Sequence, residues 1–493
     1  MRLLVLLFTA TFAVTPACAA PSPGANRVRV VTASGPISGV RGDRFDSFKG
    51  IPYAAPPIGP LRWQKPQPMA PWTQDLDASD FGPSCMQVSP PTHIVPGSPG
   101  LTLGEDCLRL NIWAPPLSSG KVGAKKAPVM VWIHGGGNDS GSPADFFMDG
   151  QNIARDGVIL VSVNYRLGLL GFFAFPGLTE DGKATGNFGL WDQVAALRWV
   201  KANIAAFGGD PDNVTLFGES AGGEDTIALL TAPAARGLFA RAIVESGGGG
   251  WGPAADIKDQ QKTFAAKFPG KTLADLRAMP AADLVKLNAD PTDPVVDHDL
   301  LPETPLAAFA AGHADPVPVV IGTNSAEGSL LGNRPADPAK VWDQLGPADL
   351  AALRAAYGDQ AKDDDAFARL LFRDGYFAGP ARFIARHANG YLYRFSYVLA
   401  PLQKRRTGAW HGSEIPFVFE RWPIDDLDAT DHAVEAAIHE DWIAFAKTGQ
   451  PGWQPLNASA REMRFDSAPA PRIPDDQSAL DILDRRLSPF NRP

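Results

Sequence analysis

One serine lies in a setting that favours nucleophilic chemistry. Ser220 is the centre of Gly-Glu-Ser-Ala-Gly at residues 218–222, which follows the apolar run Val214 to Phe217 and precedes a predicted helix that begins at Ala221. The bare pattern G-x-S-x-G is a weak indication, because it also arises by chance in long chains. The order strand, turn, helix is what a nucleophile elbow needs, with the positive end of the helix beside the hydroxyl. Ser220 is therefore predicted to be a nucleophile, and the alternative is a glycine-rich turn.

A serine hydroxyl needs a base that removes its proton and a carboxylate that orients the base. Among the eight histidines, His411 lies in a glycine-bearing loop after the strand-like run Tyr391 to Tyr397, and a parallel sheet places chemistry in such loops. Glu327 follows the predicted strand Val317 to Ile321 and precedes His411 in the sequence. We predict that both residues act with Ser220; the alternatives are a hydrogen-bonded loop histidine and a surface carboxylate.

Backbone donors for a tetrahedral oxyanion are also present. Gly-Gly-Gly at residues 135–137 follows the apolar run 129–133, and its amides are not hindered by side chains. The N–H groups of Gly136 and Gly137, joined by that of Ala221, are predicted to form an oxyanion hole.

These groups must be positioned by short β-branched runs that alternate with helical stretches. Continuous apolar runs of this length suit strands buried on both faces of a sheet. Residues 186–207 carry apolar side chains at helical spacing, which predicts a helix with one buried face. Strand, helix, strand in this order predicts an α/β fold with a large, mostly parallel sheet flanked by helices. The strand-like runs are Val129 to Ile133, Val158 to Val163, Val214 to Phe217, Ala242 to Val244 and Val317 to Ile321.

Two Ala-rich segments, at about residues 251–299 and 333–387, interrupt the series of strands and are helical in pattern. We expect them to be helices that cover the sheet and the active site. Because no low-complexity linker divides the chain, residues 20–493 are predicted to form a single domain.

Composition and charge exclude several classes of partner. The chain has 493 residues, of which 45% are hydrophobic and 20% charged, with a formal net charge of −9. Nucleic acids and anionic membrane surfaces attract clustered Lys and Arg, so neither is expected as a partner. After the N-terminal region, no segment is long and apolar enough to span a bilayer. A neutral or weakly charged small substrate fits better.

The N-terminus is typical of an export signal. Arg2 precedes an apolar stretch that continues to Val14, and small residues follow at positions 17–20. This order predicts a signal peptide at residues 1–19 that is cleaved on export to the periplasm or the medium. The alternatives are a buried N-terminal helix and a lipid anchor at Cys18, for which the two preceding residues make a poor recognition sequence.

Removal of the signal leaves Cys85 and Cys107 as the only cysteines of the chain. An isolated pair in an exported protein suggests a disulfide. Metal binding is the weaker alternative, because the pair lacks C-x-x-C spacing. The Pro-rich residues 89–97 between them are expected to form a surface excursion.

Together these motifs resemble those of the type-B carboxylesterases of the α/β-hydrolase superfamily, over nearly all of the mature chain. Residues 207–222 match the serine signature of that family at every constrained position. Residues 105–113 match its second signature except at Arg109, where Tyr, Thr or Phe is usual. Other family-like segments are Gly50 to Ala54, Asn164 to Gly168, Asn187 to Gln193 and His411 to Phe419.

The resemblance implies a carboxylic ester hydrolase of the α/β-hydrolase fold. The implied reaction is ping-pong hydrolysis of a small-molecule ester through an acyl-enzyme, and it requires no cofactor or metal. A glutamate before the serine would help to hold the histidine or a water. The implied site residues are the triad Ser220, Glu327 and His411, the oxyanion hole of Gly136, Gly137 and Ala221, the supporting Glu219, and Cys85 with Cys107 as a bridge near the gorge mouth.

Two positions depart from the family pattern. Asn138 and Asp139 follow the glycine triplet, where a bulky residue is usual, and Glu224 with Asp225 replaces small residues in the first turn after the elbow. Acidic groups suit a helix N-terminus. We hypothesise that Asn138 and Asp139 make the acyl side of the pocket more open or more polar, and that the acidic groups near Ser220 repel anionic substrates.

Two other functions compete with ester hydrolysis of small substrates. The fold also serves as a catalytically inactive binding module, since fold alone does not imply function. The second is a lipase for longer-chain esters, which would need a large apolar lid. The complete set of catalytic residues disfavours the first, and the modest hydrophobicity of the Ala-rich segments disfavours the second.

Overall fold

A large mixed sheet forms the centre of the molecule. The computed structural model describes residues 26–88, 102–117, 126–180, 182–248, 256–287, 293–342, 345–406, 408–424 and 426–487. Within them the strand order is β1-β2-β3-β7-β9-β8-β12-β13-β14-β15-β16-β17, with β4 paired to β2. The strands are Arg27–Val31 (β1), Pro36–Arg41 (β2), Asp46–Pro52 (β3), Leu76–Asp77 (β4), Arg109–Ala114 (β7), Ala127–Ile133 (β8), Ile159–Val163 (β9), Gly209–Glu219 (β12), Arg241–Glu245 (β13), Val319–Asn324 (β14), Tyr391–Phe395 (β15), Glu462–Phe465 (β16) and Ala470–Arg472 (β17).

Two short pairs of strands accompany the sheet, and helices flank it. The first pair is Ser84–Cys85 (β5) with Leu103–Gly104 (β6), and the second is Thr179–Glu180 (β10) with Lys183–Ala184 (β11). The helices are Gln151–Arg155 (α1), Gly168–Gly171 (α2), Phe188–Asn203 (α3), Ala221–Thr231 (α4), Ile257–Lys267 (α5), Leu273–Ala278 (α6), Ala281–Leu284 (α7), Pro305–Ala311 (α8), Pro338–Val341 (α9), Pro347–Tyr357 (α10), Asp364–Phe372 (α11), Gly379–His387 (α12), Ile415–Phe419 (α13), Ala429–Thr448 (α14), Leu456–Ser459 (α15) and Gln477–Leu487 (α16).

The middle of the sheet is parallel, and its two edges are antiparallel. Strands β9, β8, β12, β13, β14, β15 and β16 pair in parallel, whereas β1, β2, β3 and β7 on one side and β17 on the other pair antiparallel. The carboxyl ends of the parallel strands therefore meet at one edge of the sheet, which is where loops carry chemistry in such folds.

Both faces of this sheet are covered, as the continuous apolar runs predict. On β8, Val129 and Ile133 face one hydrophobic core, while Met130 and Trp132 face the other. Apolar residues of α3, α4 and α12 belong to the first core, and those of α1, α13 and α14 belong to the second. The sheet is thus the middle layer of three.

The predicted elements occur where the sequence patterns indicate. The strand-like runs coincide with β8, β9, β12, β13 and β14, although β9 begins one residue and β14 two residues later than predicted, at Ile159 and Val319. The predicted helix in residues 186–207 is α3. Strand β12 begins earlier than predicted, at the polar residues Gly209–Asn213, because it continues to pair with β8 across a register shift between Gly209 and Val214. The predicted signal peptide, its Cys18 and the Pro-rich residues 89–97 lie outside the described residues.

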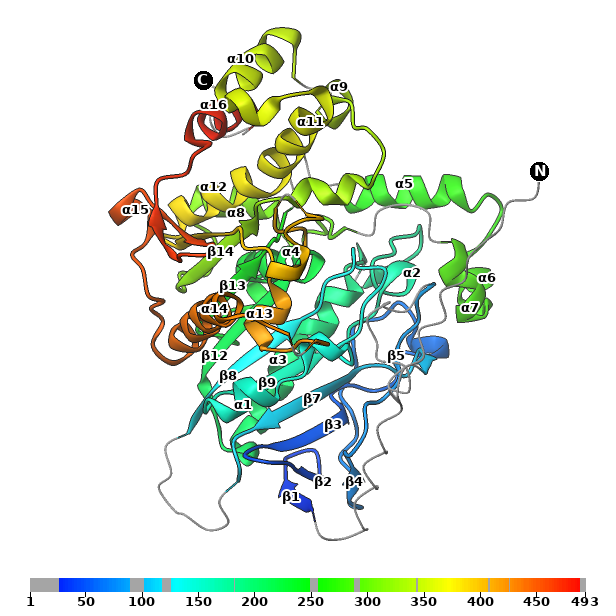
Figure 1. The fold of residues 1–493 in the computed structure, drawn as a ribbon. Helices are drawn as coiled ribbons and strands as arrows, with labels where there is room; N and C mark the ends of the chain where they lie inside the picture. The colour runs from blue at the N-terminus through cyan, green and yellow to red at the C-terminus, as the bar shows by residue number, and fades with distance from the viewer. Residues whose placement is uncertain are drawn as a thin grey trace, which may run out of the picture.

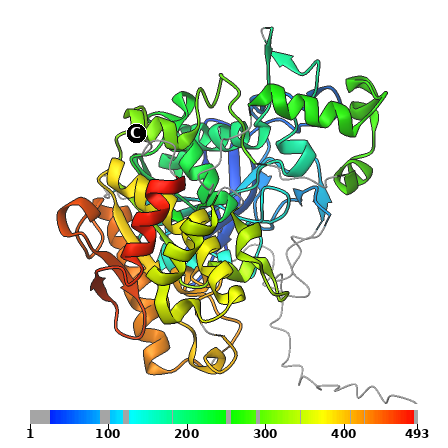
Figure 2. The same ribbon diagram turned by 90° about the horizontal axis from the view of Figure 1, so that it is seen from above.

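The Ala-rich segments form the helices that were expected to cover the sheet. Helices α5, α6 and α7 come from the first segment, and α9, α10, α11 and α12 come from the second. Figure 1 shows α9, α10 and α11 together at the top of the molecule near α16, and α5 to α7 at its right. The view from above in Figure 2 keeps these two groups of helices apart.

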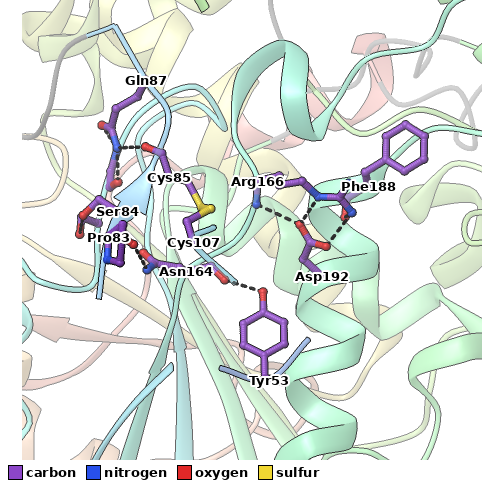
Figure 3. Close-up of a disulfide and its surroundings, with 12 residues drawn as sticks. Tyr53, Pro83, Ser84, Cys85, Gln87, Cys107, Asn164, Arg166, Phe188 and Asp192 are labelled. Carbon is purple, nitrogen blue, oxygen red and sulfur yellow. Dashed lines mark hydrogen bonds and ion pairs between the residues drawn. A yellow bond between two sulfur atoms is a disulfide. The ribbon is translucent and has the colours of Figure 1, made fainter. Parts of the chain in front are cut away.

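Segments that are distant in sequence meet beside a disulfide between Cys85 and Cys107 (Figure 3). The hydroxyl of Tyr53 donates to the carbonyl of Asn164 at 2.7 Å. Nearby, the buried guanidinium of Arg166 donates to the carboxylate of Asp192 at 2.7 Å. These contacts connect three of the family-like segments. Within the described part of the chain, no helix is both long and apolar enough to cross a membrane.

Candidate active site

Ser220 lies at the sharp turn between β12 and α4. Its backbone has φ 56° and ψ −125°, a sparsely populated conformation that persists only where surrounding contacts enforce it. The N–H of Ser220 donates to the carbonyl of Glu245 on the neighbouring strand at 2.9 Å. Gly222 must be glycine, because a Cβ there would lie 2.1 Å from the carbonyl oxygen of Ile133 on β8. This crowding holds the hydroxyl of Ser220 at the end of the sheet.

His411 lies between Ser220 and Glu327. Its Nε2 is 2.8 Å from Oγ of Ser220, and its Nδ1 is 2.6 Å from Oε2 of Glu327. The main-chain N–H of His411 also donates to Oγ of Ser329, at 3.2 Å. The three residues follow β12, β14 and β15. These strands lie close together in the sheet, in the order β12-β13-β14-β15. They have the arrangement of a nucleophile, a base and an orienting acid.

The carboxylate of Glu327 is fully buried and fixed by two donors. Its Oε1 accepts hydrogen bonds from Oγ of Ser246 at 2.6 Å and from the N–H of Asn324 at 2.7 Å. Sequence reasoning did not identify Ser246. The sequence feature that could have indicated Ser246 is its position directly after strand β13, at the same edge of the sheet as the other groups.

Further buried carboxyl groups surround His411. Oε1 of Glu219 is 3.3 Å from Nε2 of His411, so this residue lies where the sequence predicts a supporting glutamate. Glu414 bonds to the side-chain amide of Asn324 and lies 3.4 Å from Oγ of Ser246. Burial raises the pKa of Glu219 to about 7 and that of Glu414 to about 8. Burial alone would lower the pKa of His411, but the carboxylates of Glu219 and Glu327 raise it above its ordinary value.

The glycine loop lies directly beside the serine. A Cβ on Gly135 would come within 2.9 Å of Cβ of Ser220. Gly136 and Gly137 are exposed and have φ of 112° and 63°, a conformation that glycine adopts without strain. His134 is buried and stacked on Tyr165 with ring centroids 4.5 Å apart. Burial lowers the pKa of His134 to about 4, so it is neutral at physiological pH.

The disulfide segment holds the far end of the glycine loop. Gln87, two residues after Cys85, donates to the carbonyl of Gly141 at 2.9 Å and accepts from its N–H at 3.0 Å. The hydroxyl groups of Ser84 and Ser142 are 2.7 Å apart. Figure 3 shows Ser84 and Gln87 extending from the same segment as the bridged cysteine. The bridge therefore supports the loop that borders Ser220.

The two acidic residues after the elbow point in different directions. Glu224 is half-buried, and its Oε1 accepts a hydrogen bond from the hydroxyl of Tyr376 at 3.4 Å. Burial raises the pKa of Glu224 to about 8. Asp225 is fully buried and bonds to Asn138 and Gln193. Asp139 is exposed. Of the acidic residues at these departing positions, Asp225 is enclosed, whereas Glu224 and Asp139 are at least partly exposed and are the candidates to affect a substrate by charge.

Two aromatic residues next to the site were missed by sequence reasoning. Tyr376 and Phe377 lie on a π-helical stretch, Arg373–Ala378, between α11 and α12. The rings of Phe377 and His411 are 5.4 Å apart. The available signal was Gly375 and Gly379 on either side of an aromatic pair within an Ala-rich helical segment. Such bulges are frequent at functional sites.

One cluster outside this site has residue types that bind metals. Asp156, Glu420 and His439 offer ligand atoms within 4.8 Å of one another. Both ring nitrogens of His439 are already engaged, Nδ1 with the carbonyl of Val418 at 2.7 Å and Nε2 with Asp156 at 2.8 Å. A metal would need a free lone pair on the imidazole, so this cluster is better explained as an ion pair between the buried His439 and the exposed Asp156.

Comparisons with known proteins agree with the architecture. The sequence profile described as carboxylesterase family matches residues 26–469. The chain belongs to the carboxylesterase family. This carboxylesterase is 36% identical to para-nitrobenzyl esterase of Bacillus subtilis (strain 168) over 475 residues, 87% of this chain and 91% of the relative. It is 33% identical to fumonisin B1 esterase of Sphingopyxis macrogoltabida over 465 residues, 85% of this chain and 82% of the relative.

Solved structures support the same assignment. A PNB esterase aligns with this carboxylesterase with a TM-score of 0.77 and 32% identity, covering 92% of this chain and 99% of that one. The α/β-hydrolase fold predicted from the sequence is therefore confirmed. The chain is a serine carboxylesterase, an enzyme that hydrolyses carboxylic esters.

Proposed function

We propose that this carboxylesterase hydrolyses small-molecule esters through an acyl-enzyme formed on Ser220. The observation that supports this most strongly is the continuous contact from Oγ of Ser220 through His411 to the buried carboxylate of Glu327. In the first half-reaction Nε2 of His411 takes the proton of Ser220 while Oγ attacks the ester carbonyl carbon. The C–O bond to the alcohol then breaks, and His411 gives its proton to the leaving oxygen.

The second half-reaction repeats these steps with water. His411 removes a proton from water, the resulting hydroxide attacks the acyl carbon, and the bond to Oγ of Ser220 breaks as His411 returns the proton. Glu327 orients His411 and stabilises the imidazolium in both halves. Its donors Ser246 and Asn324 hold the carboxyl group in place beside Nδ1 of His411.

The negative charge of each tetrahedral intermediate is assigned to the N–H groups of Gly136, Gly137 and Ala221. The glycine loop borders Ser220, and Ala221 begins α4, whose positive end also favours an anion. Such preorganised donors supply a large part of the rate enhancement in acyl transfer.

The cellular location of this reaction is proposed to be outside the cytoplasm. Residues 1–19 act as a cleaved signal, and residues 20–493 form the mature single domain. The disulfide between Cys85 and Cys107 is compatible with an oxidising compartment. N-terminal sequencing of protein recovered from the periplasm or medium tests this, with Ala20 as the expected first residue and an intact Met1 as the contrary result.

Hydrolysis of p-nitrophenyl acetate and butyrate by the purified mature protein tests the proposed mechanism. We expect turnover by the native chain and a loss of at least about 10³-fold in kcat for Ser220→Ala, His411→Ala and the double variant alike, because triad members act as a unit. Full activity of Ser220→Ala would contradict the proposal. An inactive native chain would favour the binding module, and a marked preference for emulsified over soluble esters would favour the lipase.

A further inference from the structure

The two sequence features that depart from the family pattern touch each other. Nδ2 of Asn138, directly after the glycine triplet, donates to Oδ1 of Asp225 at 3.2 Å. Nε2 of Gln193 on α3 donates to Oδ2 of the same carboxylate at 2.5 Å. All three side chains are buried, with exposures of 1% for Asn138 and 0% for Asp225 and Gln193. They form one buried polar network.

The hydrogen bond between Asn138 and Asp225 connects the two segments that supply the proposed oxyanion donors, the glycine loop and the start of α4. Asn138 is bonded covalently to Gly137, whose N–H is assigned to the hole. Asp225 lies four residues after Ala221 on α4, so the two are one helical turn apart on the same face. A hydrogen bond between Asn138 and Asp225 therefore fixes the distance between the glycine loop and the start of the helix.

The backbone of Asn138 is also held in place. The carbonyl of Asn138 accepts a hydrogen bond from the N–H of Gly168 at 2.7 Å, and its backbone has φ 56°, a left-handed conformation. Asn tolerates this conformation better than most residues. Oδ1 of Asn138 has no hydrogen-bond partner among the described residues. The bond to Asp225 is thus the one hydrogen bond of this side chain among the described residues, and it runs from the amide to the carboxylate.

We propose that Asp225 is a positioning residue that holds the oxyanion loop in its active geometry through Asn138. This inference rests on the proposed function, in which Gly136, Gly137 and Ala221 stabilise the oxyanion. Gln193 anchors the second oxygen of the carboxylate, so the loop is tied to both α3 and α4. Gln87 and Ser84 hold the other end of the loop, at Gly141 and Ser142. A loop fixed at both ends keeps its donors aimed at the reacting oxygen.

Exchange of the two side chains gives a sharp test. In Asn138→Asp, two carboxylates face each other, and their repulsion displaces the loop. In Asp225→Ala, the amide of Asn138 loses its acceptor. In the double variant N138D/D225N, the amide at position 225 donates to the carboxylate at 138 while its oxygen still accepts from Gln193. The network is then restored with the polarity of one bond reversed.

We expect each single variant to lower kcat for p-nitrophenyl butyrate by about ten- to a hundredfold, with KM changed less than about threefold. Displacement of transition-state donors by about 1 Å has effects of this size. The double variant should recover most of the lost kcat. Asp212→Asn, at an exposed carboxylate on β12, is the matched control and should behave as the native enzyme.

A native kcat in both single variants would overturn the inference, and so would a double variant that is no more active than N138D. A loss that appears only in KM would overturn it as well. If N138D fails to fold by circular dichroism, Asn138→Gly replaces it, because glycine tolerates φ 56° and adds no charge; the same fall in kcat is expected and a native kcat again contradicts the inference. Ser220→Ala is assayed in parallel, since its retained activity would refute the proposed function rather than the positioning role.

Discussion

Glu219 is the residue whose charge acts most directly on His411. Its carboxylate is 3.3 Å from Nε2, and it raises the pKa of the imidazole together with Glu327. In the proposed mechanism His411 must be neutral to accept the proton of Ser220, so activity is expected to rise with pH through the pKa of His411. Glu219→Gln removes one of the charges that stabilise the imidazolium. We therefore expect the acidic limb of the pH profile of kcat/KM to move to lower pH.

Measurement of kcat/KM for p-nitrophenyl butyrate from about pH 6 to pH 11, corrected for spontaneous hydrolysis, checks this shift, because the pKa of His411 is raised to about 10. Glu440→Gln, which changes an exposed carboxylate on α14, is the control and should keep the native profile. An unchanged acidic limb in Glu219→Gln, with native stability, would show that Glu219 does not influence the titration of His411.

Glu224 and Asp139 are the acidic residues expected to select among substrates by charge. Burial raises the pKa of Glu224 to about 8 and also raises that of Asp139. Glu224 is mostly neutral below pH 8 and ionises above it. Glu224→Gln should therefore raise kcat/KM for a carboxylate-bearing ester by about fivefold above pH 8, corresponding to roughly 1 kcal/mol of relieved repulsion. Asp139→Asn should act in the same direction.

A neutral ester of the same length is the reference substrate for these two variants. Its kcat/KM should stay near the native value, because no charge is repelled. Equal gains on both esters would point to a change of pocket shape, and unchanged rates on the anionic ester would refute the role of charge at these positions.

Helices α14 and α1 are joined by the buried His439. The sequence suggests a polar helical setting for this histidine, but the structure buries it against Asp156 at the end of α1 and the carbonyl of Val418 on α13. Burial opposes the charged imidazole, yet the hydrogen bond to Asp156 and the charge of Glu420 raise its pKa above the ordinary 6.5. The difference arises because both partners lie far away in the sequence.

This contact predicts a pH-dependent stability. A histidine whose pKa is raised by folding contributes stability that is complete below its unfolded pKa of about 6.5 and is lost as pH rises through its folded pKa. His439→Gln should therefore lower Tm most near about pH 6 and progressively less above that. Thermal unfolding of both proteins from about pH 6 to 9 measures the difference, and a constant difference in Tm would contradict the ionic role.

The strands could be predicted from the sequence more fully than the surroundings of the site. Apolar runs such as Val129 to Ile133 are local signals that do not depend on partners. The sequence allowed the prediction of Ser220, Glu327 and His411, because each follows such a run or lies in the loop after one. Ser246 also follows a strand, but nothing in the sequence marks it as a partner of Glu327, because that contact spans 81 positions. The importance of Tyr376 likewise comes from its contact with Glu224, which lies 152 positions away. The contact between Asn138 and Asp225 could not be predicted either, because these residues are 87 positions apart in the sequence.

The molecule as a whole is stabilised by a covalent link that also borders the site. The bridge between Cys85 and Cys107 closes a separation of 22 residues. On the chain-entropy view, loss of such a link lowers the free energy of unfolding by about 3 kcal/mol. We expect Cys85→Ala/Cys107→Ala to show that loss in urea unfolding. Native protein treated with a reductant should match the double variant, and equal stability of the oxidised native protein and the variant would contradict the prediction.

The parallel sheet brings the proposed machinery together at one edge. The carboxyl ends of β8, β12, β13, β14 and β15 carry, in that order, the glycine loop, Ser220, Ser246, Glu327 and the loop of His411. Residues separated by more than 250 positions thereby surround one point in space. The nucleophile at this point is proposed to be Ser220.

Covalent labelling tests the assignment of Ser220 as the nucleophile. The mature protein is treated with a fluorophosphonate, digested and mapped by mass spectrometry, beside Ser220→Ala. Phosphonylation of the peptide that contains Ser220, its absence in the variant and parallel loss of ester hydrolysis are the predicted results. A label on a different residue, or continued hydrolysis by a fully labelled Ser220, would contradict the account.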